Sequence, residues 1–314
     1  MAKKALVVLM GYVVLAVLVL PLCITLLWGG FFKGDTQEVE GAKEAKELVE
    51  LEDVFASELE EYIVGVVSAE MPAAFDDEAL KAQAVAARTY QVRKMQEVAT
   101  EEVLYDIGQA YCSIEEQKEK WGENYIEYAN KVRKAVEATQ GEIMVYGEAE
   151  EPILAVFHAQ SAGKTESSEN VWTSPLPYLK SVEIEEDKEA PNNEFRCSIL
   201  AKEVWEKLSV YGSLSQSEAD LTFSNIERSE AGYIQTLQVG GLTLTGKQVR
   251  EALGLRSANF EVERENESFS FVTHGYGHGA GMSQYGASFL AEQGMDYKEI
   301  LCYFYQGISF KNIA

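Results

Sequence analysis

Apolar side chains recur at helical spacing in some segments of the chain and alternate with polar ones in others. Helical spacing predicts one helix after Asp76 and further helices over residues 57–69, 125–136, 283–293 and 297–305. Alternation predicts strands over residues 143–146, 153–158, 233–239, 242–244, 260–264, 269–274 and 308–312. This mixture, without an internal repeat, predicts an α+β fold.

Capping residues mark the ends of the first two predicted helices. Ser57 and Glu60 have the spacing of a capping box, and Pro72 ends the helix that follows them. Asp76 is a typical N-cap for the second helix. That helix has alanines at positions 79, 82, 84, 86 and 87, and these small side chains predict close packing against neighbouring elements.

The first 30 residues contain an uncharged, Leu- and Val-rich run over residues 5–28, which predicts a transmembrane anchor because about 20 apolar residues cross a bilayer. Lys3 and Lys4 precede the run, so the positive-inside rule places the N-terminus in the cytoplasm and the remainder outside. A cleaved signal peptide is the alternative, but no small-x-small cleavage site follows closely. Residues 31–56 then form a charged juxtamembrane stalk. Residues 57–314 form a catalytic domain with a smaller α/β subdomain inserted around 190–260.

The net charge limits the kinds of partner, and the spacing of the cysteines limits the kinds of disulfide and metal site. A net charge of −24 argues against a nucleic-acid partner and against docking on anionic lipid headgroups. Cys23 lies in the anchor, which leaves Cys112, Cys197 and Cys302 without a CxxC pair or zinc-type spacing. Either one disulfide with a free thiol or three unpaired cysteines is compatible with the sequence.

All three histidines lie in Gly- or Ser-rich segments. His158 precedes residues 159–165, and His274 and His278 lie in a stretch with five glycines between positions 275 and 286. Such a backbone allows tight turns and close approach to a ligand, which favours a functional loop. The alternative is a simple turn with two hydrogen-bonded histidines.

Glu70 stands out among the carboxylates because it follows apolar residues at the predicted end of the first helix. Apolar surroundings and the negative end of a helix both raise the pKa of a glutamate, and a raised pKa suits a general acid near neutrality. The alternative is an exposed glutamate at a helix end.

The second helix places Lys81, Gln83, Arg88 and Tyr90 around its alanines, and Gln83 and Tyr90 share one face. An arginine in such a tightly packed helix is costly to bury without a partner. Arg88 therefore either forms a structural pair with an acidic residue or binds a polar ligand.

Five segments together resemble the stage II sporulation protein D family: residues 70–72, 79–90, 157–172, 245–255 and 275–287. The resemblance implies a membrane-anchored peptidoglycan lytic transglycosylase that acts during engulfment of the forespore. It implies that Glu70 is the sole catalytic acid and base. The bond cleaved would join N-acetylmuramic acid to N-acetylglucosamine in strands stripped of stem peptides, and the products would carry 1,6-anhydro-muramyl ends.

The same resemblance implies a glycan groove, a location and partners. The residues expected to bind substrate are Gln83, Arg88, Tyr90, Ser161, Lys164, His274, His278, Ser283 and Gln284. The catalytic domain would lie in the septal space between mother cell and forespore, with a cell-wall amidase and membrane proteins of the engulfment machinery as partners. No cofactor is expected. Some family members hold a metal near residues 105–113, where this chain keeps Cys112 but no histidine, so a structural zinc is not expected here.

Two other functions are compatible with the sequence. His158, His274 and His278 could ligate zinc in a hydrolase, although no HExxH motif is present. Alternatively the chain enhances or binds a cell-wall amidase without catalysis, because related domains occur in proteins named for that effect.

Overall fold

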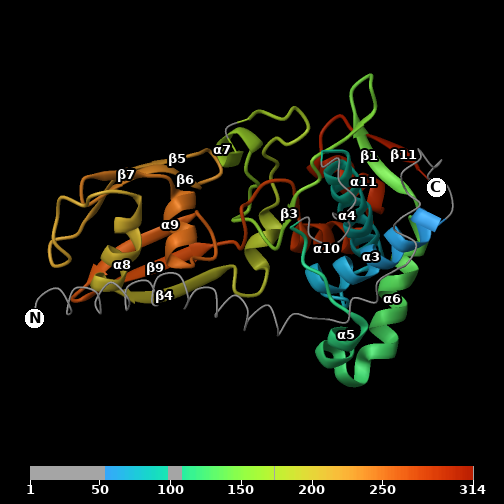
Figure 1. Cartoon of the computed structure of the whole chain (residues 1–314), viewed down its shortest axis with the longest axis horizontal. Helices are drawn as coiled ribbons and strands as arrows, with labels where there is room; N and C mark the ends of the chain where they lie inside the picture. The colour runs from blue at the N-terminus through green and yellow to red at the C-terminus, as the bar shows by residue number, and fades with distance from the viewer. Residues whose placement is uncertain (1–53, 98–107, 173, 314) are drawn as a thin grey trace, which may run out of the picture. The chain divides into compact units, whose positions relative to one another are not determined.

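The computed structural model describes residues 54–97, 108–172 and 174–313 of the chain (Figure 1). The predicted anchor at 1–30 and the predicted stalk up to residue 53 lie outside these residues. None of the helices within the described ranges combines the length and the apolar composition that crossing a bilayer requires.

Helix α4 (Asp77–Glu97) is the centre of the first hydrophobic core. Its alanines at 79, 82, 84, 86 and 87 have no exposed surface, which confirms the close packing predicted from their size. The predicted cap also forms, because Glu78 donates its backbone N–H to Asp76 Oδ1 at 2.9 Å. The elements that contact α4 include α3 (Val54–Glu70), α6 (Tyr125–Ala138), α10 (Gln284–Glu292), α11 (Tyr297–Phe304) and β1 (Glu142–Tyr146).

Strand β1 is the middle strand of a small antiparallel sheet, between β11 (Ser309–Asn312) and β2 (Glu151–Pro152). The predicted strand over 153–158 is wrong as a single element. The chain pairs with β1 as far as Pro152, and only Phe157–His158 forms a further strand, β3, which pairs in parallel with β10 (Met282–Ser283). The segment is apolar because Ile153 and Ala155 are buried between these two pairings, and burial alone does not require a ladder.

A second hydrophobic core is formed by two three-stranded antiparallel sheets with two helices between them (Figure 1). It confirms the hairpin predicted at 233–244 and the strands predicted at 260–264 and 269–274. Its buried side chains run from Ala201 to Phe271, which extends beyond the predicted insertion at 190–260. The sheets are β4 (Glu194–Leu200), β9 (Ser268–His274) and β8 (Phe260–Glu265), and β5 (Phe223–Arg228), β6 (Ile234–Val239) and β7 (Leu242–Leu244). The helices are α8 (Ala201–Leu208) and α9 (Gly246–Leu253).

Several short helices were not predicted from the pattern. Helix α5 begins after Ser113, which forms a capping box with Glu116. The short helices are α5 (Ile114–Trp121), η2 (Gly122–Asn124), α7 (Ser168–Trp172), η3 (Glu185–Glu189) and η4 (Ser209–Tyr211). With them, helices and strands are mixed throughout the described residues, in agreement with the predicted α+β class.

The glycine-rich segment between β9 and β10 packs tightly against Val156 beside the first core and against the buried Tyr233, which precedes β6. Gly281 has φ +71°, and a Cβ there would lie 2.0 Å from the backbone oxygen of Val156, next to the first core. Gly279 has φ +83°, and a Cβ there would lie 2.4 Å from the buried Tyr233 ring. Glycine is required at both positions because a side chain would clash and because positive φ is unfavourable for other residues.

Candidate active site

Glu70 is the last residue of α3, and its carboxylate is half-buried. Ala110 donates its backbone N–H to Glu70 Oε1 at 2.9 Å. Lys120 Nζ lies nearby but binds the backbone oxygens of Ser68 (2.7 Å) and Ala69 (3.1 Å), so no described cation pairs directly with the carboxylate. Burial raises the pKa of Glu70, and the Ala110 hydrogen bond and the charge of Lys120 oppose that rise only in part. The predicted direction of the pKa shift is therefore confirmed, and loss of solvent, one of its two expected causes, is the main one.

The segment that supplies the Ala110 N–H is held against α3 at Gly65. Tyr111 stacks on Tyr62 with ring centroids 5.6 Å apart, and Cys112 donates its backbone N–H to Gly65 O at 3.1 Å. A Cβ on Gly65 would lie only 2.1 Å from Tyr111 Cε2. The missing side chain at position 65 thus allows the segment to reach Glu70.

Gly65→Ala tests that arrangement. Alanine adds about 1 kcal/mol of helix propensity, but it displaces the stacked Tyr111, an arrangement worth about 0.5–1.5 kcal/mol, so the free energy of unfolding should change little. We expect the displaced Ala110 N–H to weaken its bond to Glu70 and the pKa of Glu70 to rise further. An NMR titration of the Glu70 carboxyl in both proteins measures this. An unchanged titration would show that the segment does not depend on Gly65.

Helix α10, which follows the glycine-rich segment and β10, contacts α4 through two glutamines. Gln284 Nε2 donates to Gln83 Oε1 at 3.2 Å, and both side chains are buried. Next to Gln284, Tyr285 packs edge-on against Phe75, which follows Glu70 by five positions, with ring centroids 4.9 Å apart. The structure thus places the start of α10 close to the turn that follows α3.

Arg88 does not reach solvent, which corrects its predicted place in a glycan groove. Its side chain has no exposed surface and forms a bidentate pair with Glu60, at 2.7 Å from Nε and 2.6 Å from Nη2. Nη1 also donates to Glu142 O at 3.1 Å. The geometry therefore favours a structural ion pair for Arg88 over the binding of a polar ligand. Tyr90, two residues further along α4, is half-buried beside Lys94.

Asp187 joins two of the predicted binding residues. Its Oδ2 accepts the Ser161 backbone N–H at 2.7 Å, and its Oδ1 accepts Ser283 Oγ–H at 2.8 Å. Ser161 and Ser283 have no exposed surface, so they fix the loops rather than line a groove, which corrects that prediction. Asp187 is the middle residue of the acidic helix η3, and nothing in that charged run indicates that one carboxylate is buried.

Burial raises the pKa of Asp187 to about 6, although its hydrogen bonds to Ser161 and Ser283 lower it. The folded state therefore binds this proton more tightly than the unfolded chain, in which the ordinary pKa is 3.8. The resulting stabilisation is complete below the lower pKa and is lost as the pH rises through 6. We expect the free energy of unfolding of the unmodified chain, measured relative to that of Asp187→Asn, to increase as the pH falls from about 7 to about 4. Urea unfolding at several pH values measures it, and a constant difference would contradict the assignment.

The three histidines do not converge. His158 and His278 lie close together, with ring centroids 5.8 Å apart, whereas His274 is on β9 with Nε2 4.0 Å from Glu261 Oε1. Burial lowers the pKa of His158 to about 3 and that of His278 to about 4, so both rings are neutral. Within the described ranges, no three His, Cys, Asp or Glu side chains are grouped to hold a metal ion, which counts against the three-histidine zinc hydrolase.

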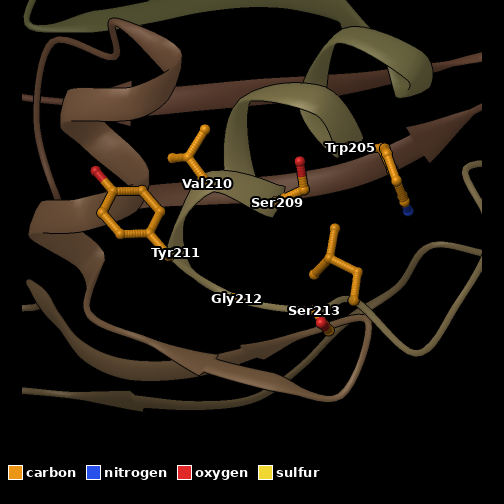
Figure 2. Close-up of a pocket in the computed structure, with 7 residues that line it drawn as sticks. Trp205, Ser209, Val210, Tyr211, Gly212 and Ser213 are labelled. Carbon is orange, nitrogen blue, oxygen red and sulfur yellow. The ribbon is translucent and has the colours of Figure 1, made fainter.

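The remaining predicted residue, Lys164, pairs at the surface with Glu183 Oε1 at 3.0 Å. A shallow hollow lies elsewhere, beside α8, and Figure 2 shows Val210 and Tyr211 at its edge. Its lining residues are Trp205 and 209–214, none of which is charged. The hollow therefore offers no acid or base and is separate from Glu70.

Sequence comparison identifies the family. A family model described as Stage II sporulation protein (SpoIID) matches residues 49–146. Stage II sporulation protein D of Bacillus subtilis (strain 168) is 42% identical over 256 residues, covering 79% of this chain and 73% of that protein. This chain belongs to the stage II sporulation protein D family. Its counterpart from Bacillus amyloliquefaciens is 40% identical over 257 residues, 80% of this chain and 73% of that one.

A more distant relative carries a different name. The amidase enhancer of Bacillus subtilis (strain 168) is 26% identical over 296 residues, which cover 77% of this chain and 39% of that protein. The stage II sporulation protein D family thus has similarity to a protein named for its effect on an amidase.

The segment matched by the family model includes Glu70 and Cys112. Burial raises the pKa of the Cys112 thiol. The three cysteines at 112, 197 and 302 are unpaired in the structure. Within the described residues, Cys112 does not belong to a group of three His, Cys, Asp or Glu side chains that could hold a metal ion, and the absence of a structural zinc stays a prediction.

Proposed function

We propose that this chain is a peptidoglycan lytic transglycosylase that acts on glycan strands without stem peptides during forespore engulfment. The observation that supports it most directly is the carboxyl group of Glu70. It is half-buried, accepts one backbone hydrogen bond and has a raised pKa, and no cation among the described residues forms an ion pair with it. Such a group holds a proton at a higher pH than an ordinary glutamate and can donate it to a leaving oxygen.

In the proposed reaction, Glu70 protonates the oxygen that leaves the anomeric carbon of the muramyl residue. The resulting carboxylate then takes the proton of the muramyl 6-hydroxyl, whose oxygen attacks the same carbon. The glycosidic bond breaks, a 1,6-anhydro ring forms and no water is consumed. One carboxyl group suffices because the nucleophile belongs to the substrate, unlike glycosidases that use two carboxylates.

The location and partners belong to the same proposal. Anchored through residues 1–30, the catalytic domain would face the septal space between the two membranes. A cell-wall amidase would remove the stem peptides first, and membrane proteins of the engulfment machinery would position the chain. The names of the relatives, which refer to stage II of sporulation, support this assignment.

Product analysis tests the reaction. Peptide-free glycan strands incubated with the full chain should yield anhydro-muramyl ends, each lighter by one water than the product of hydrolysis. Mass spectrometry distinguishes the two. Reducing muramyl ends would indicate a hydrolase, and intact strands would remove the proposal.

The pH dependence of kcat/KM offers a further prediction. The free protein must carry a protonated Glu70, so kcat/KM should fall as the pH rises through the pKa of that group. Because burial raises this pKa above the ordinary 4.5, the fall should occur at a higher pH than for an exposed glutamate. Initial rates on peptide-free strands across acid and neutral pH measure it. A rate that stays constant over this range is incompatible with Glu70 as the acid.

A non-catalytic amidase enhancer is the second candidate, favoured by the similarity to the protein of that name. In that case the chain would increase the rate of a cell-wall amidase on intact peptidoglycan while leaving peptide-free strands uncut. Measuring both activities on the same preparation separates the two functions.

A further inference from the structure

The segment that contacts Glu70 also brings a lysine to the end of the same helix. Ala110 supplies the N–H that Glu70 accepts, and the chain then continues into α5, where Lys120 lies in the last turn. Lys120 Nζ donates to Ser68 O at 2.7 Å and to Ala69 O at 3.1 Å. These are the carbonyl groups of the two residues that precede Glu70. The lysine charge is thus held at the C-terminus of α3, next to the residue proposed as the acid.

Helix α5 is tied to its surroundings at both ends, so Lys120 starts from a defined position. Near the N-terminus, Gln117 Nε2 donates to Cys112 O at 2.9 Å. At the C-terminus, the Trp121 ring packs in the first core and stands edge-on to Tyr128, with ring centroids 6.0 Å apart. The residue after Lys120 is therefore buried, while Lys120 itself lies at the surface.

The carbonyls that Lys120 binds lack other helical donors. Position 72 is a proline without an N–H, so the Ser68 carbonyl has no partner four residues further on. Unsatisfied carbonyls at a helix end carry partial negative charge, which opposes ionisation of a nearby carboxyl group. Lys120 satisfies them and adds a positive charge. Because its Nζ binds the main chain instead of the carboxylate, the oxygens of Glu70 stay available for proton transfer.

Among the described residues, the other charged groups around α3 are engaged elsewhere or exposed. Burial raises the pKa of Glu70, and the Ala110 hydrogen bond and then the Lys120 charge oppose that rise. On the segment that carries Lys120, the Cys112 thiol is neutral because burial raises its pKa, Glu116 bonds Ser113, and Glu115, Lys118 and Glu119 are exposed. On α4 and α6, the helices that contact α3, Lys81 pairs with Glu78, Arg88 with Glu60, Arg93 and Lys94 with Glu97, Lys131 with Asp77 and Arg133 with Glu61, whereas Glu127, Lys134 and Glu137 are exposed.

We propose that Lys120 is a positioning residue for Glu70, which caps the end of α3 and stabilises the carboxylate that exists between the two proton transfers. The inference rests on the proposed function, in which Glu70 first gives its proton to the leaving oxygen and then takes the proton of the 6-hydroxyl. A positive charge beside the newly formed carboxylate makes Glu70 a stronger acid in the first step. Because Lys120 lies at the surface, solvent screens its charge, and Glu70 still keeps a raised pKa.

Lys120→Met tests the proposal because it removes the charge and the donors together. With less positive charge nearby, the pKa of Glu70 should rise further, so the fall of kcat/KM with rising pH should move to a higher pH. Glu70 also becomes a weaker acid, so the maximal kcat/KM on peptide-free strands should decrease about 2- to 10-fold. A purely structural loss would lower the rate at every pH without moving the fall. An NMR titration of the Glu70 carboxyl measures the same shift without requiring activity.

Three further variants separate the charge from the hydrogen bonds and from general effects on α5. Lys120→Gln keeps a donor for the carbonyls without the charge and should behave as Lys120→Met does. Lys120→Arg keeps both and should titrate and cleave like the unmodified chain. Lys118→Met is the matched control, because Lys118 lies on the same helix with its Nζ 5.8 Å from the centre of the Tyr125 ring, and it should change neither measurement.

Two results overturn the proposal while the transglycosylase stands. One is an unchanged Glu70 titration in Lys120→Met and Lys120→Gln. The other is a rate that falls equally at every pH, or that Lys120→Arg does not restore. If instead the unmodified chain cleaves nothing but the titration shifts as expected, the transglycosylase is refuted and the effect of Lys120 on the Glu70 carboxyl remains.

Discussion

Glu70→Gln is expected to abolish the release of anhydro-muramyl ends while leaving the fold intact. Glutamine has nearly the same shape, and its side-chain oxygen can still accept the Ala110 N–H that now lies 2.9 Å from the carboxylate. It cannot donate a proton to the leaving oxygen or accept one from the 6-hydroxyl. General acid–base catalysis contributes about 10²- to 10⁴-fold, and one group performs both roles here, so we expect a loss of at least about 10³-fold.

The matched control for this variant lies on the same helix. Glu61 is 61% exposed and pairs with Arg133 at the surface, so Glu61→Gln removes one carboxylate from α3 without touching the site. Rates on peptide-free strands and thermal unfolding of both variants complete the experiment. If Glu70→Gln unfolds like the unmodified chain and still cleaves at a comparable rate, Glu70 is not the acid and the proposed mechanism is wrong.

Arg88→Met is expected to cause the largest loss of stability among single substitutions of charged residues. The variant leaves the Glu60 carboxylate, whose side chain is only 14% exposed, without its bidentate partner. Breaking a buried pair in this way costs about 3–5 kcal/mol. Glu60 also accepts the Gly141 backbone N–H at 3.1 Å, so the pair joins α3 and α4 to the start of β1. Urea unfolding measures the change in the free energy of unfolding.

Two further variants separate the buried pair from a general charge effect. Arg133→Met breaks the exposed pair with Glu61 and should cost about 0–1 kcal/mol. The double variant Glu60→Leu with Arg88→Met should recover part of the loss, because no unpaired charge remains. If Arg88→Met lowers the free energy of unfolding no more than Arg133→Met does, the pair of Arg88 with Glu60 does not stabilise the fold.

Periodicity predicted α4, the helices that pack around it and about half of the strands because these elements bury one face or all faces in a regular way. The alanines of α4 and the hairpin at 233–244 were predicted for this reason. The prediction of a strand at 153–158 was wrong because an apolar run indicates that a segment is buried but not which strand it pairs with. Here Pro152 and Phe157 pair with different strands on either side of an unpaired stretch.

The candidate site was predicted only in part, since the sequence shows which residues are unusual but not which are neighbours. The raised pKa of Glu70 agrees with the expectation. The partner of Arg88 is 28 positions away on another helix, and no local pattern indicates it. Asp187 was missed because its burial follows from loops that meet only in the folded chain.

The glycine-rich segment has a consequence for hybrid proteins made from two relatives. Gly279 fits against the buried Tyr233, which precedes β6, and Gly281 fits against Val156 beside the first core. A chimera that exchanges residues 190–260 alone would pack the glycine-rich segment of one relative against Tyr233 and its neighbours from the other relative. Exchanging residues 190–281 as one block keeps the contact with Tyr233 and moves the mismatch to the contacts that the block makes with residues 156–166.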